Sequence, residues 1–209
     1  MKSNSEGLMI NGIVSYIDRD NIDTDQIIPT EYLKSIKKFG YEDYLFDGWR
    51  YNDDGKLGVK KEDRDINKGF ILNNKPFTES KILLSRDNFG CGSSREHAVW
   101  AIYDYGFRAV VSSFFADIFK NNCLNIGVLP IQVSDSFLLE IFSQIDKDSE
   151  SLFEINLENQ EFIIKELNKK EVFKISLYKK GNMSNGYDDI DYLLNKKEDI
   201  SRFANKFIY

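Results

Sequence analysis

The sequence is poor in cysteine, proline and histidine, and each shortage excludes a class of protein. Its 209 residues include 2 cysteines, 3 prolines and 1 histidine. Two cysteines outside any Cys-x-x-Cys pair give no disulfide framework, so we expect reduced thiols and a cytoplasmic protein. With so few prolines, no proline-rich linker divides the chain.

Long apolar runs and an excess of basic charge are also missing. No segment approaches the roughly 18 apolar residues that a membrane-spanning helix requires, and residues 1–12 lack the apolar core of a signal peptide. The 28 basic residues are outnumbered by 34 acidic ones, so the net charge is −6. This balance argues against a nucleic-acid-binding surface. We expect neither a membrane nor a nucleic-acid partner.

The composition that remains is that of a folded protein. Hydrophobic residues make up 42% of the chain and aromatic residues 14%, well above the content of a disordered chain. A chain of this length suits one domain better than two. We expect a single domain over residues 1–209, with a loop excursion around 47–80 and a helical extension around 188–209.

The middle of the chain alternates short apolar strands with helices. Strands are expected at residues 82–85, 107–112 and 128–131, and helices over the ten or so residues up to 105 and at 117–125. Glycines follow both helices and predict where they end. Strand–helix–strand–helix–strand at this spacing predicts a parallel βαβαβ core with right-handed crossovers.

The two ends of the chain have other patterns. Residues 8–17 alternate as one strand. Residues 152–157 and 161–166 predict a hairpin, with a third strand at 172–178. Amphipathic spacing near the C-terminus predicts one or two closing helices. The predicted class is α/β, a parallel core with antiparallel C-terminal strands.

A glycine-rich segment at residues 86–97 (RDNFGCGSSREH) is the most informative for chemistry. Its two glycines allow a tight turn between a strand and a helix, and Ser93, Ser94 and Arg95 follow where that helix begins. Free backbone N–H groups and the positive end of the helix dipole attract a carboxylate or phosphate. The guanidinium of Arg95 adds a planar two-pronged grip.

Other interpretations of this segment stay open. Ser93 and Glu96 also fit a capping box, in which Ser93 only starts the helix. A serine hydrolase fits poorly, because Gly-Cys-Gly-Ser-Ser is not Gly-x-Ser-x-Gly and His97 lies one helical turn from Ser93. Two glycines are too few for a dinucleotide fingerprint. Cys91 beside the turn is either a reactive thiol or a small buried one.

Four aspartates, at positions 18, 20, 23 and 25, suggest a metal loop, but the glycine and the distal glutamate of a calcium loop are missing. Aspartates that cap turns explain the spacing as well. Two cysteines and one histidine cannot hold a cubane iron–sulfur cluster, which needs three or four thiolates. We expect this chain to bind no metal.

Two segments together resemble a known enzyme family. They are residues 20–29 (DNIDTDQIIP) and 88–98 (NFGCGSSREHA), and the similarity continues in order through residues 45–50, 105–107, 113–119 and 185–186. These motifs resemble the small subunit of 3-isopropylmalate dehydratase, a relative of the swivelling fourth domain of aconitases. The resemblance implies an aconitase-type swivelling β/β/α domain.

The resemblance implies one subunit of a hydro-lyase. The reaction would interconvert 2- and 3-isopropylmalate by dehydration and rehydration, in leucine biosynthesis. In the family a large subunit carries a [4Fe-4S] cluster whose open iron acts as a Lewis acid, and the small subunit closes the active site. We therefore expect a cytoplasmic heterodimer with a large iron–sulfur subunit, a cluster held by that partner, and a dicarboxylate substrate.

The resemblance also implies roles for individual residues. Ser93 matches the catalytic base, a hydroxyl that N–H groups, a helix N-terminus and a cation would hold as an alkoxide. Ser94 and Arg95 match positions that bind a substrate carboxylate. Thr24 and Asp25 match a pair that lines the aconitase site.

Substrate choice is expected to depend on a neighbouring stretch. Ile28 stands where aconitases carry a polar serine, which favours a substrate with an apolar branch. Tyr32, Leu33, Lys34 and Ser35 match the loop that distinguishes isopropylmalate, homoaconitate and methylmalate enzymes, and we expect the Lys34 ammonium to extend into solvent. The small subunit of a methylmalate (citraconate) or homoaconitate dehydratase stays an alternative, and a non-catalytic anion-binding module a more distant one.

Overall fold

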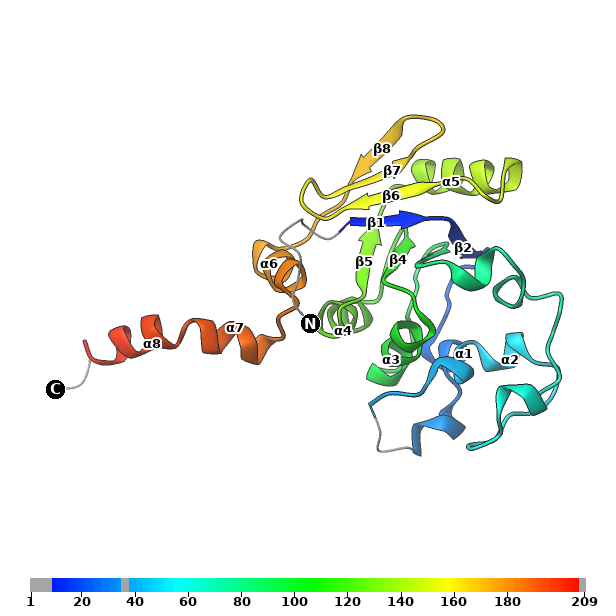
Figure 1. Ribbon diagram of the computed structural model, residues 1–209, viewed down its shortest axis with the longest axis horizontal. Coiled ribbons are helices and arrows are strands. Elements are labelled where there is room, and N and C mark those ends of the chain that lie inside the picture. Colours follow the sequence, from blue (N-terminus) through cyan, green and yellow to red (C-terminus); the bar gives the residue numbers. More distant parts are fainter. Residues whose placement is uncertain (1–8, 35–37, 207–209) are drawn as a thin grey trace.

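A four-stranded parallel sheet forms the centre of the computed structural model, which describes residues 9–34 and 38–206 (Figure 1). Its strands, in spatial order, are β2 (Val14–Ile17), β3 (Ile82–Ser85), β4 (Ala109–Ser112) and β5 (Leu129–Gln132). Helix α3 (Glu96–Tyr105) joins β3 to β4, and α4 (Asp117–Ile126) joins β4 to β5. The predicted βαβαβ core and both helix ends, at Gly106 and Gly127, are confirmed.

An antiparallel sheet packs against this core. Its spatial order is β1 (Met9–Gly12), β6 (Phe153–Asn156), β7 (Glu161–Ile164) and β8 (Lys169–Val172). Helix α5 (Asp135–Lys147) leads from β5 into this sheet, beginning at Ser134, whose hydroxyl accepts a hydrogen bond from the Phe137 N–H. The predicted hairpin of β6 and β7 is confirmed.

Two strand predictions are wrong in their extent. The strand expected at 8–17 is two strands, because β1 pairs with β6 in one sheet while β2 pairs with β3 in the other. The third C-terminal strand lies at 169–172 instead of 172–178, since the Ser176 hydroxyl caps the N–H of Lys179 and starts helix α6 (Leu177–Asn185). Strand β8 is an exposed edge, so its sequence carries no apolar alternation.

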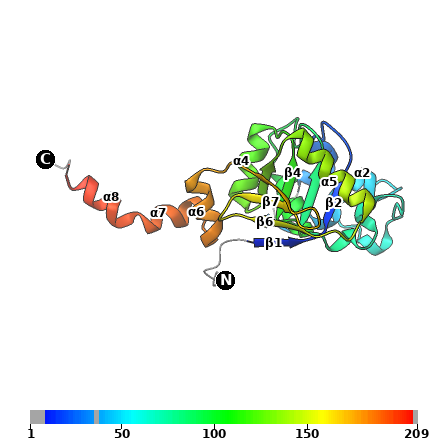
Figure 2. The same cartoon turned by 90° about the horizontal axis from the view of Figure 1, so that it is seen from above.

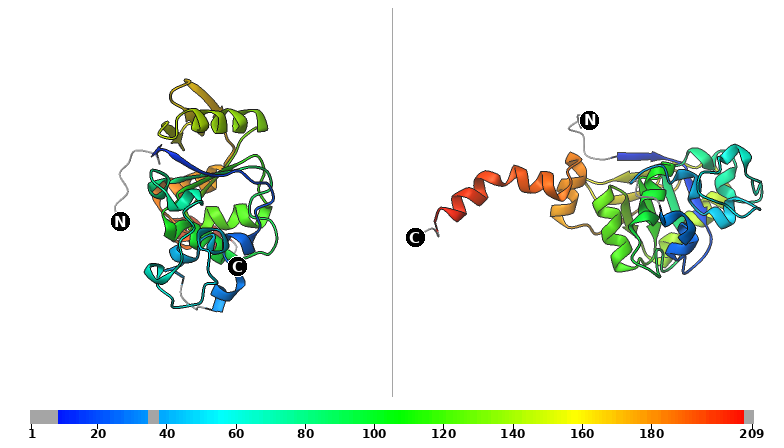
Figure 3. Two further views of the ribbon diagram at one scale, coloured as in Figure 1. Left: turned by 90° about the vertical axis from the view of Figure 1, so that its right-hand side faces the viewer. Right: turned by 90° about the horizontal axis from the view of Figure 1, so that it is seen from below.

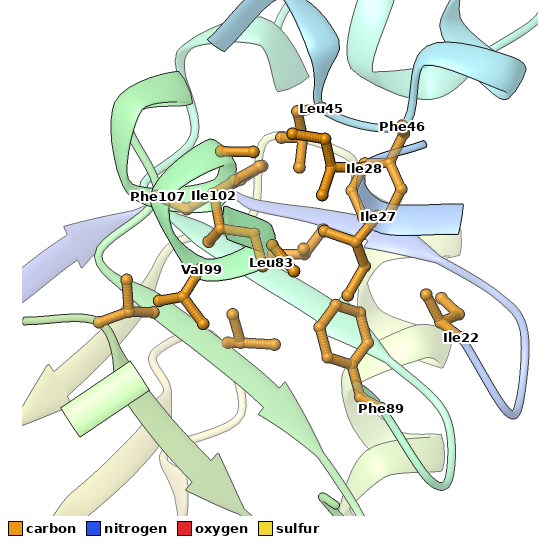
Figure 4. Packing of buried hydrophobic residues seen from close by; sticks show 14 of the residues in the cluster. Ile22, Ile27, Ile28, Leu45, Phe46, Leu83, Phe89, Val99, Ile102 and Phe107 are labelled. Atoms are coloured by element: carbon orange, nitrogen blue, oxygen red, sulfur yellow. The ribbon is translucent and has the colours of Figure 1, made fainter. Parts of the chain in front are cut away.

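Alternate residues of the parallel strands serve two separate cores. Leu83 and Val110 face a cluster with α1 (Thr24–Ile27), α3 and α4, part of which Figure 4 shows. Ile82, Leu84 and Val111 face a second cluster with α5 and the antiparallel sheet. Both faces of the sheet are therefore covered, which explains its continuous apolar runs.

The excursion around residues 47–80 has little regular structure but is ordered by buried arginines. It contains helix α2 (Asp47–Arg50) and 3₁₀ turns at Lys61–Asp63, Ile71–Asn73 and Phe77–Glu79. Arg50, 1% exposed, donates 2.8 Å to the Glu42 carbonyl oxygen. Arg64 pairs with Asp47 over 2.7 Å. These bonds replace the backbone ladders that a sheet or long helix would supply.

The chain ends in two helices that leave the body. Helices α7 (Asp189–Asn195) and α8 (Lys197–Ala204) follow α6 and extend away from both sheets (Figures 1 and 2, and Figure 3, right). The expected C-terminal helices are present, but they do not close the fold. Across the part of the chain that the structure describes, no helix is long and apolar enough to cross a membrane.

Candidate active site

The two motif-bearing segments lie side by side because they follow neighbouring parallel strands. Strands β2 and β3 pair in register, Ile17 opposite Ser85, so their carboxyl ends meet at one edge of the sheet. Beyond that edge Asn21 N–H donates 2.9 Å to the Asp87 carbonyl, and Thr24 N–H donates 2.9 Å to the Cys91 carbonyl. The segments 18–25 and 86–93 thus form one continuous paired structure.

The aspartates of the first segment are engaged in turns and ion pairs. Asp18 pairs with Arg86. Asp23 caps α1 in a reciprocal box with Gln26, accepting 2.7 Å from its N–H while Gln26 Oε1 accepts 3.0 Å from the Asp23 N–H. Among the described residues, no three His, Cys, Asp or Glu side chains gather as a metal site would require. Ion pairs engage Asp18 and Asp25, a hydrogen bond to the Asp87 N–H engages Asp20, and a helix cap engages Asp23.

The glycine-rich turn is pressed directly onto helix α4. Gly90 has φ +76°, and a Cβ there would lie 2.6 Å from the Cβ of Phe119. Gly92 has φ +88° and lies over Asp23, whose Cβ would be 3.4 Å away. Only glycine meets both requirements at position 90, a left-handed backbone and no room for a side chain.

Ser93 is held by its backbone and exposes its side chain. Its carbonyl oxygen accepts 3.1 Å from the Thr24 hydroxyl and 2.8 Å from the Arg95 N–H. Helix α3 begins at Glu96 with Arg95 in the N-cap position and no side-chain cap. The capping-box interpretation is therefore wrong, because Ser93 lies two residues before the cap.

A cavity of about 300 Å³ lies over this turn. It is lined by residues of the turn, by Thr24 and by the first turns of α4, namely Thr24, Gly90, Gly92, Ser93, Ser94, Arg95, Ala116, Asp117, Ile118, Phe119 and Asn122. The N-cap residues of α3 and α4, Arg95 and Ala116, both line it, and neither helix carries a side-chain cap. The positive dipole ends of the two helices favour an anion, while Asp117 places a carboxylate in the first turn of α4.

Arg95 is positioned by an acid at the edge of the cavity. Its guanidinium pairs with the Asp25 carboxylate, which also accepts 2.7 Å from the Thr30 hydroxyl. The hydrogen bonds from Arg95 and then Thr30 hold the pKa of the Asp25 carboxyl below its usual range. The expected site residues Thr24, Ser93, Ser94 and Arg95 thus meet at one cavity, with Asp25 beside them.

The chain matches known proteins over its whole core and its site. Residues 6–136 match the model of the aconitase C-terminal domain. The 3-isopropylmalate dehydratase small subunit of Christiangramia forsetii is 48% identical over 190 residues, 91% of this chain and 88% of that protein. That of Cytophaga hutchinsonii is 47% identical over 202 residues, 97% of this chain and 96% of that protein. This chain belongs to the family of 3-isopropylmalate dehydratase small subunits.

A solved structure has the same architecture. The crystal structure of 3-isopropylmalate dehydratase from Methanocaldococcus jannaschii aligns with a TM-score of 0.62 and 28% identity, over 93% of this chain and 99% of that one. The fold, a parallel sheet with helices plus an antiparallel C-terminal sheet, is that of the aconitase C-terminal domain. The predicted family and fold class are confirmed.

One expected substrate contact of this family member lies elsewhere. Ile28 is fully buried in the cluster that Figure 4 shows, beside Leu45 and Phe46, and it does not line the cavity. The apolar wall of the cavity comes instead from Ile118 and Phe119 of α4. The resemblance to aconitases suggested Ile28, while the burial of its side chain follows from the packing of α1.

The loop expected to set substrate specificity is held to the core by the side chains of Tyr32 and Leu33. Tyr32 is 1% exposed and stacks on Tyr44 with ring centroids 4.1 Å apart. Leu33 packs partly against the core, and Lys34 is exposed, as expected for a solvated ammonium. Ser35 lies outside the described residues.

Burial shifts the pKa values of the two cysteine thiols and of the histidine ring toward their uncharged forms. Burial, and then the Asp23 charge, raise the pKa of the Cys91 thiol, and burial raises that of the fully buried Cys123. His97 packs 4.5 Å from the Trp100 ring and 5.6 Å from the Tyr41 ring, and burial lowers its pKa. A neutral, ring-packed histidine fits the structural role expected for it.

The contribution of α4 to the cavity was not expected from the sequence. Asp117, Ile118 and Asn122 line it, and they come from the helix that follows β4. The signal was available, because a third parallel strand delivers its following loop to the same edge of the sheet. The turn is tied there as well, since Phe89 N–H donates 3.0 Å to the Phe114 carbonyl.

Proposed function

We propose that this chain pairs with a large iron–sulfur subunit to form a 3-isopropylmalate dehydratase, a hydro-lyase of leucine biosynthesis in the cytoplasm. One observation carries the proposal: Ser93, Ser94, Arg95 and Thr24 line a single cavity that the N-cap residues of α3 and α4 also line. Family membership supports the reaction assigned to it.

The substrate is a dicarboxylate, and the cavity has the electrostatics for one. Arg95 offers a fixed guanidinium, and the first turns of α3 and α4 offer N–H groups without side-chain caps. Ser94 adds a hydroxyl at the same wall. Ile118 and Phe119 supply an apolar surface of the kind that an isopropyl branch would cover.

Ser93 acts as the general base. Its hydroxyl, ionised, removes the proton from the carbon next to a substrate carboxylate and returns a proton during rehydration. A serine hydroxyl is a weak base near neutral pH, so the alkoxide needs stabilisation by the nearby helix N-terminus and by Arg95. Thr24 fixes the backbone of Ser93, so the base is held before substrate arrives.

The residues of this chain do not fit an iron–sulfur cluster. Its only thiols are Cys91 and Cys123, and Cys123 is enclosed in the core, whereas a cubane cluster needs three or four thiolates. In this proposal the [4Fe-4S] cluster belongs to the large subunit, where it supplies a Lewis acid for the substrate hydroxyl.

Exposed apolar side chains beside the cavity form a surface that a partner subunit can cover. Phe114 and Ile118 are 47% and 56% exposed, and Ile118 lines the cavity itself. Large exposed apolar side chains beside a cavity are typical of a surface that a partner covers. Closure by the large subunit would exclude water from the reacting carbon.

The test is anaerobic co-expression with candidate large subunits. The conjugated diacid formed from 2- and 3-isopropylmalate is followed and compared with the products from citramalate and homocitrate. The proposal predicts the highest kcat/KM with isopropylmalate and some activity with the methyl analogue, because a pocket discriminates by only about 1–3 kcal/mol per methylene. Preference for homocitrate would assign the chain to a homoaconitate enzyme, and binding of small anions without turnover would leave the anion-binding module.

A further inference from the structure

The C-terminal arm, defined as residues 189–204, is held firmly at its base. Asp189 accepts 2.9 Å from Lys179 Nζ and 2.7 Å from the Tyr178 hydroxyl, both on α6. The ring of Tyr178 meets that of Tyr192 edge-on at 4.6 Å. These contacts join the first turn of the arm to α6, and from there the arm extends away from the body (Figures 1 and 2).

The arm exposes a run of apolar side chains beyond this base. Ile190, Leu193, Leu194 and Ile200 are between 50% and 66% exposed. Helices α7 and α8 have only 7 and 8 residues, whereas isolated helices shorter than roughly 12–15 residues are marginal in water. An apolar surface on short projecting helices points to a partner that covers it and stabilises them.

A second copy of this chain fits the arm poorly. The arm consists of two short helices that meet at Lys196, and Lys197 follows directly, so no continuous apolar helix–helix seam runs along two paired arms. The arm has 16 residues from Asp189 to Ala204, fewer than the roughly 20–30 residues per side of a stable interface. The arm therefore supplements a larger interface instead of forming one alone.

That larger interface is available at the other end of α4. The first turn of α4 lines the cavity, while Asn125 in its last turn accepts 2.7 Å from Lys179 at the base of the arm. A ten-residue helix spans about 15 Å, so one protein covering the cavity rim can also reach the arm. The match to the Cytophaga hutchinsonii small subunit covers 202 of the 209 residues and so extends into the arm.

We infer that the C-terminal arm docks into a groove of the large subunit, with Ile190, Leu193, Leu194 and Ile200 as its anchors; this rests on the proposed function. The docking mode is an amphipathic helix in an apolar groove: Ile190, Leu193 and Leu194 stand at i, i+3 and i+4 on α7, and Ile200 continues the contact from α8. The arm and the cavity rim then hold the large subunit at two points. The apolar side chains of the arm determine the affinity for the large subunit, while the residues at the cavity determine the rate of turnover.

The test uses the full chain carrying Leu193→Ser and Leu194→Ser, titrated into a fixed amount of the large subunit. A matched control carries Leu139→Ser and Leu152→Ser, which are 55% and 48% exposed on the body. We expect the arm variant to bind about 10-fold more weakly or worse, with kcat at saturation and the thermal midpoint unchanged, and the control to bind like wild type. Ile200→Ser alone should weaken binding in the same direction.

Each other outcome decides against the inference in a distinct way. If wild-type complex forms and turns over but the arm variants bind equally well, the arm is not the docking element and the proposed function stands. If the isolated wild-type chain is a dimer by light scattering and the arm variant is a monomer with unchanged affinity for the large subunit, the arm pairs with a second copy. If no large subunit supports binding or turnover, the proposed function fails, and the inference with it.

Discussion

The Thr24 hydroxyl donates a hydrogen bond of 3.1 Å to the Ser93 carbonyl oxygen, although the two residues are 69 positions apart. Thr24 is 1% exposed and begins α1, while Ser93 lies in the turn before α3. The bond joins the loops after β2 and β3 at the cavity. The position of Ser93 therefore depends on a residue that follows a different strand.

Thr24→Val tests this dependence, because valine keeps the shape of threonine and removes the donor. Loss of the bond costs about 1 kcal/mol of stability, and misplacement of Ser93 should lower kcat roughly 10- to 100-fold. Thr24→Ser retains the donor and should keep most of the activity. Steady-state kinetics and thermal melting of both variants measure the difference, and equal kcat in wild type and Thr24→Val would show that the bond does not position the base.

Arg95→Lys tests the grip on a substrate carboxylate. Lysine keeps the charge but loses the planar fork, so KM should rise about 10-fold or more while the fold persists. Asp25→Asn should raise KM less, because it removes only the acid that orients Arg95. Unchanged KM in Arg95→Lys would remove its assigned role.

The pH dependence of the Asp25–Arg95 pair follows from the direction of the Asp25 pKa. Because the pKa is lowered in the folded chain by Arg95 and Thr30, the contribution of the pair is present above the unfolded value of about 3.9. It is lost only as the pH falls through the lower folded value. The pH–rate profile between about 5 and 9 should therefore be the same shape for wild type and Asp25→Asn, and a new inflection in that range would contradict this assignment.

The Arg64 guanidinium holds the excursion together. It is 2.7 Å from Asp47 Oδ1 and 2.8 Å from Asp53 Oδ2, and a Cβ at Gly55 would lie 2.7 Å from its Nη1. Arg64→Met leaves the buried Asp47 charge unpaired and should cost about 3–5 kcal/mol. Chemical denaturation measures this, and a loss under 1 kcal/mol would mean that the excursion is stabilised elsewhere.

Cys91 should react slowly with alkylating agents at neutral pH. Burial and the Asp23 charge raise the pKa of its thiol, so little of the nucleophilic thiolate is present. Cys123 should react only after unfolding, since it is fully buried. Mass spectrometry after timed iodoacetamide treatment distinguishes the two thiols, and rapid labelling of Cys91 at pH 7 would mean a more open turn.

The central sheet could be predicted from sequence because its signals are local. Apolar runs at residues 82–85 and 128–131 and the glycines after α3 and α4 are enough to place strands and helix ends. The division of residues 8–17 could not be predicted, since β1 and β2 continue one alternation while pairing with strands far apart in the chain. Strand β8 lacked any signal because its residues are mostly exposed.

The site was partly predictable for a similar reason. Ser93 and Arg95 lie in a recognisable turn, and Thr24 in a motif that resembles the same family. The wall formed by Ile118 depends on where α4 packs, and the burial of Ile28 depends on how α1 meets its core. Both are consequences of tertiary packing, which local pattern does not encode.

Turnover by Ser93→Ala in the assembled enzyme tests the account most directly. The side chain of Ser93 caps no helix, since Arg95 occupies the cap position, so removal of its hydroxyl should leave the thermal midpoint and binding to the large subunit unchanged. The general-base role predicts that kcat for isopropylmalate falls by about 10²–10⁴-fold or more. A variant that forms the complex and keeps wild-type kcat would contradict the assignment of Ser93 as the base.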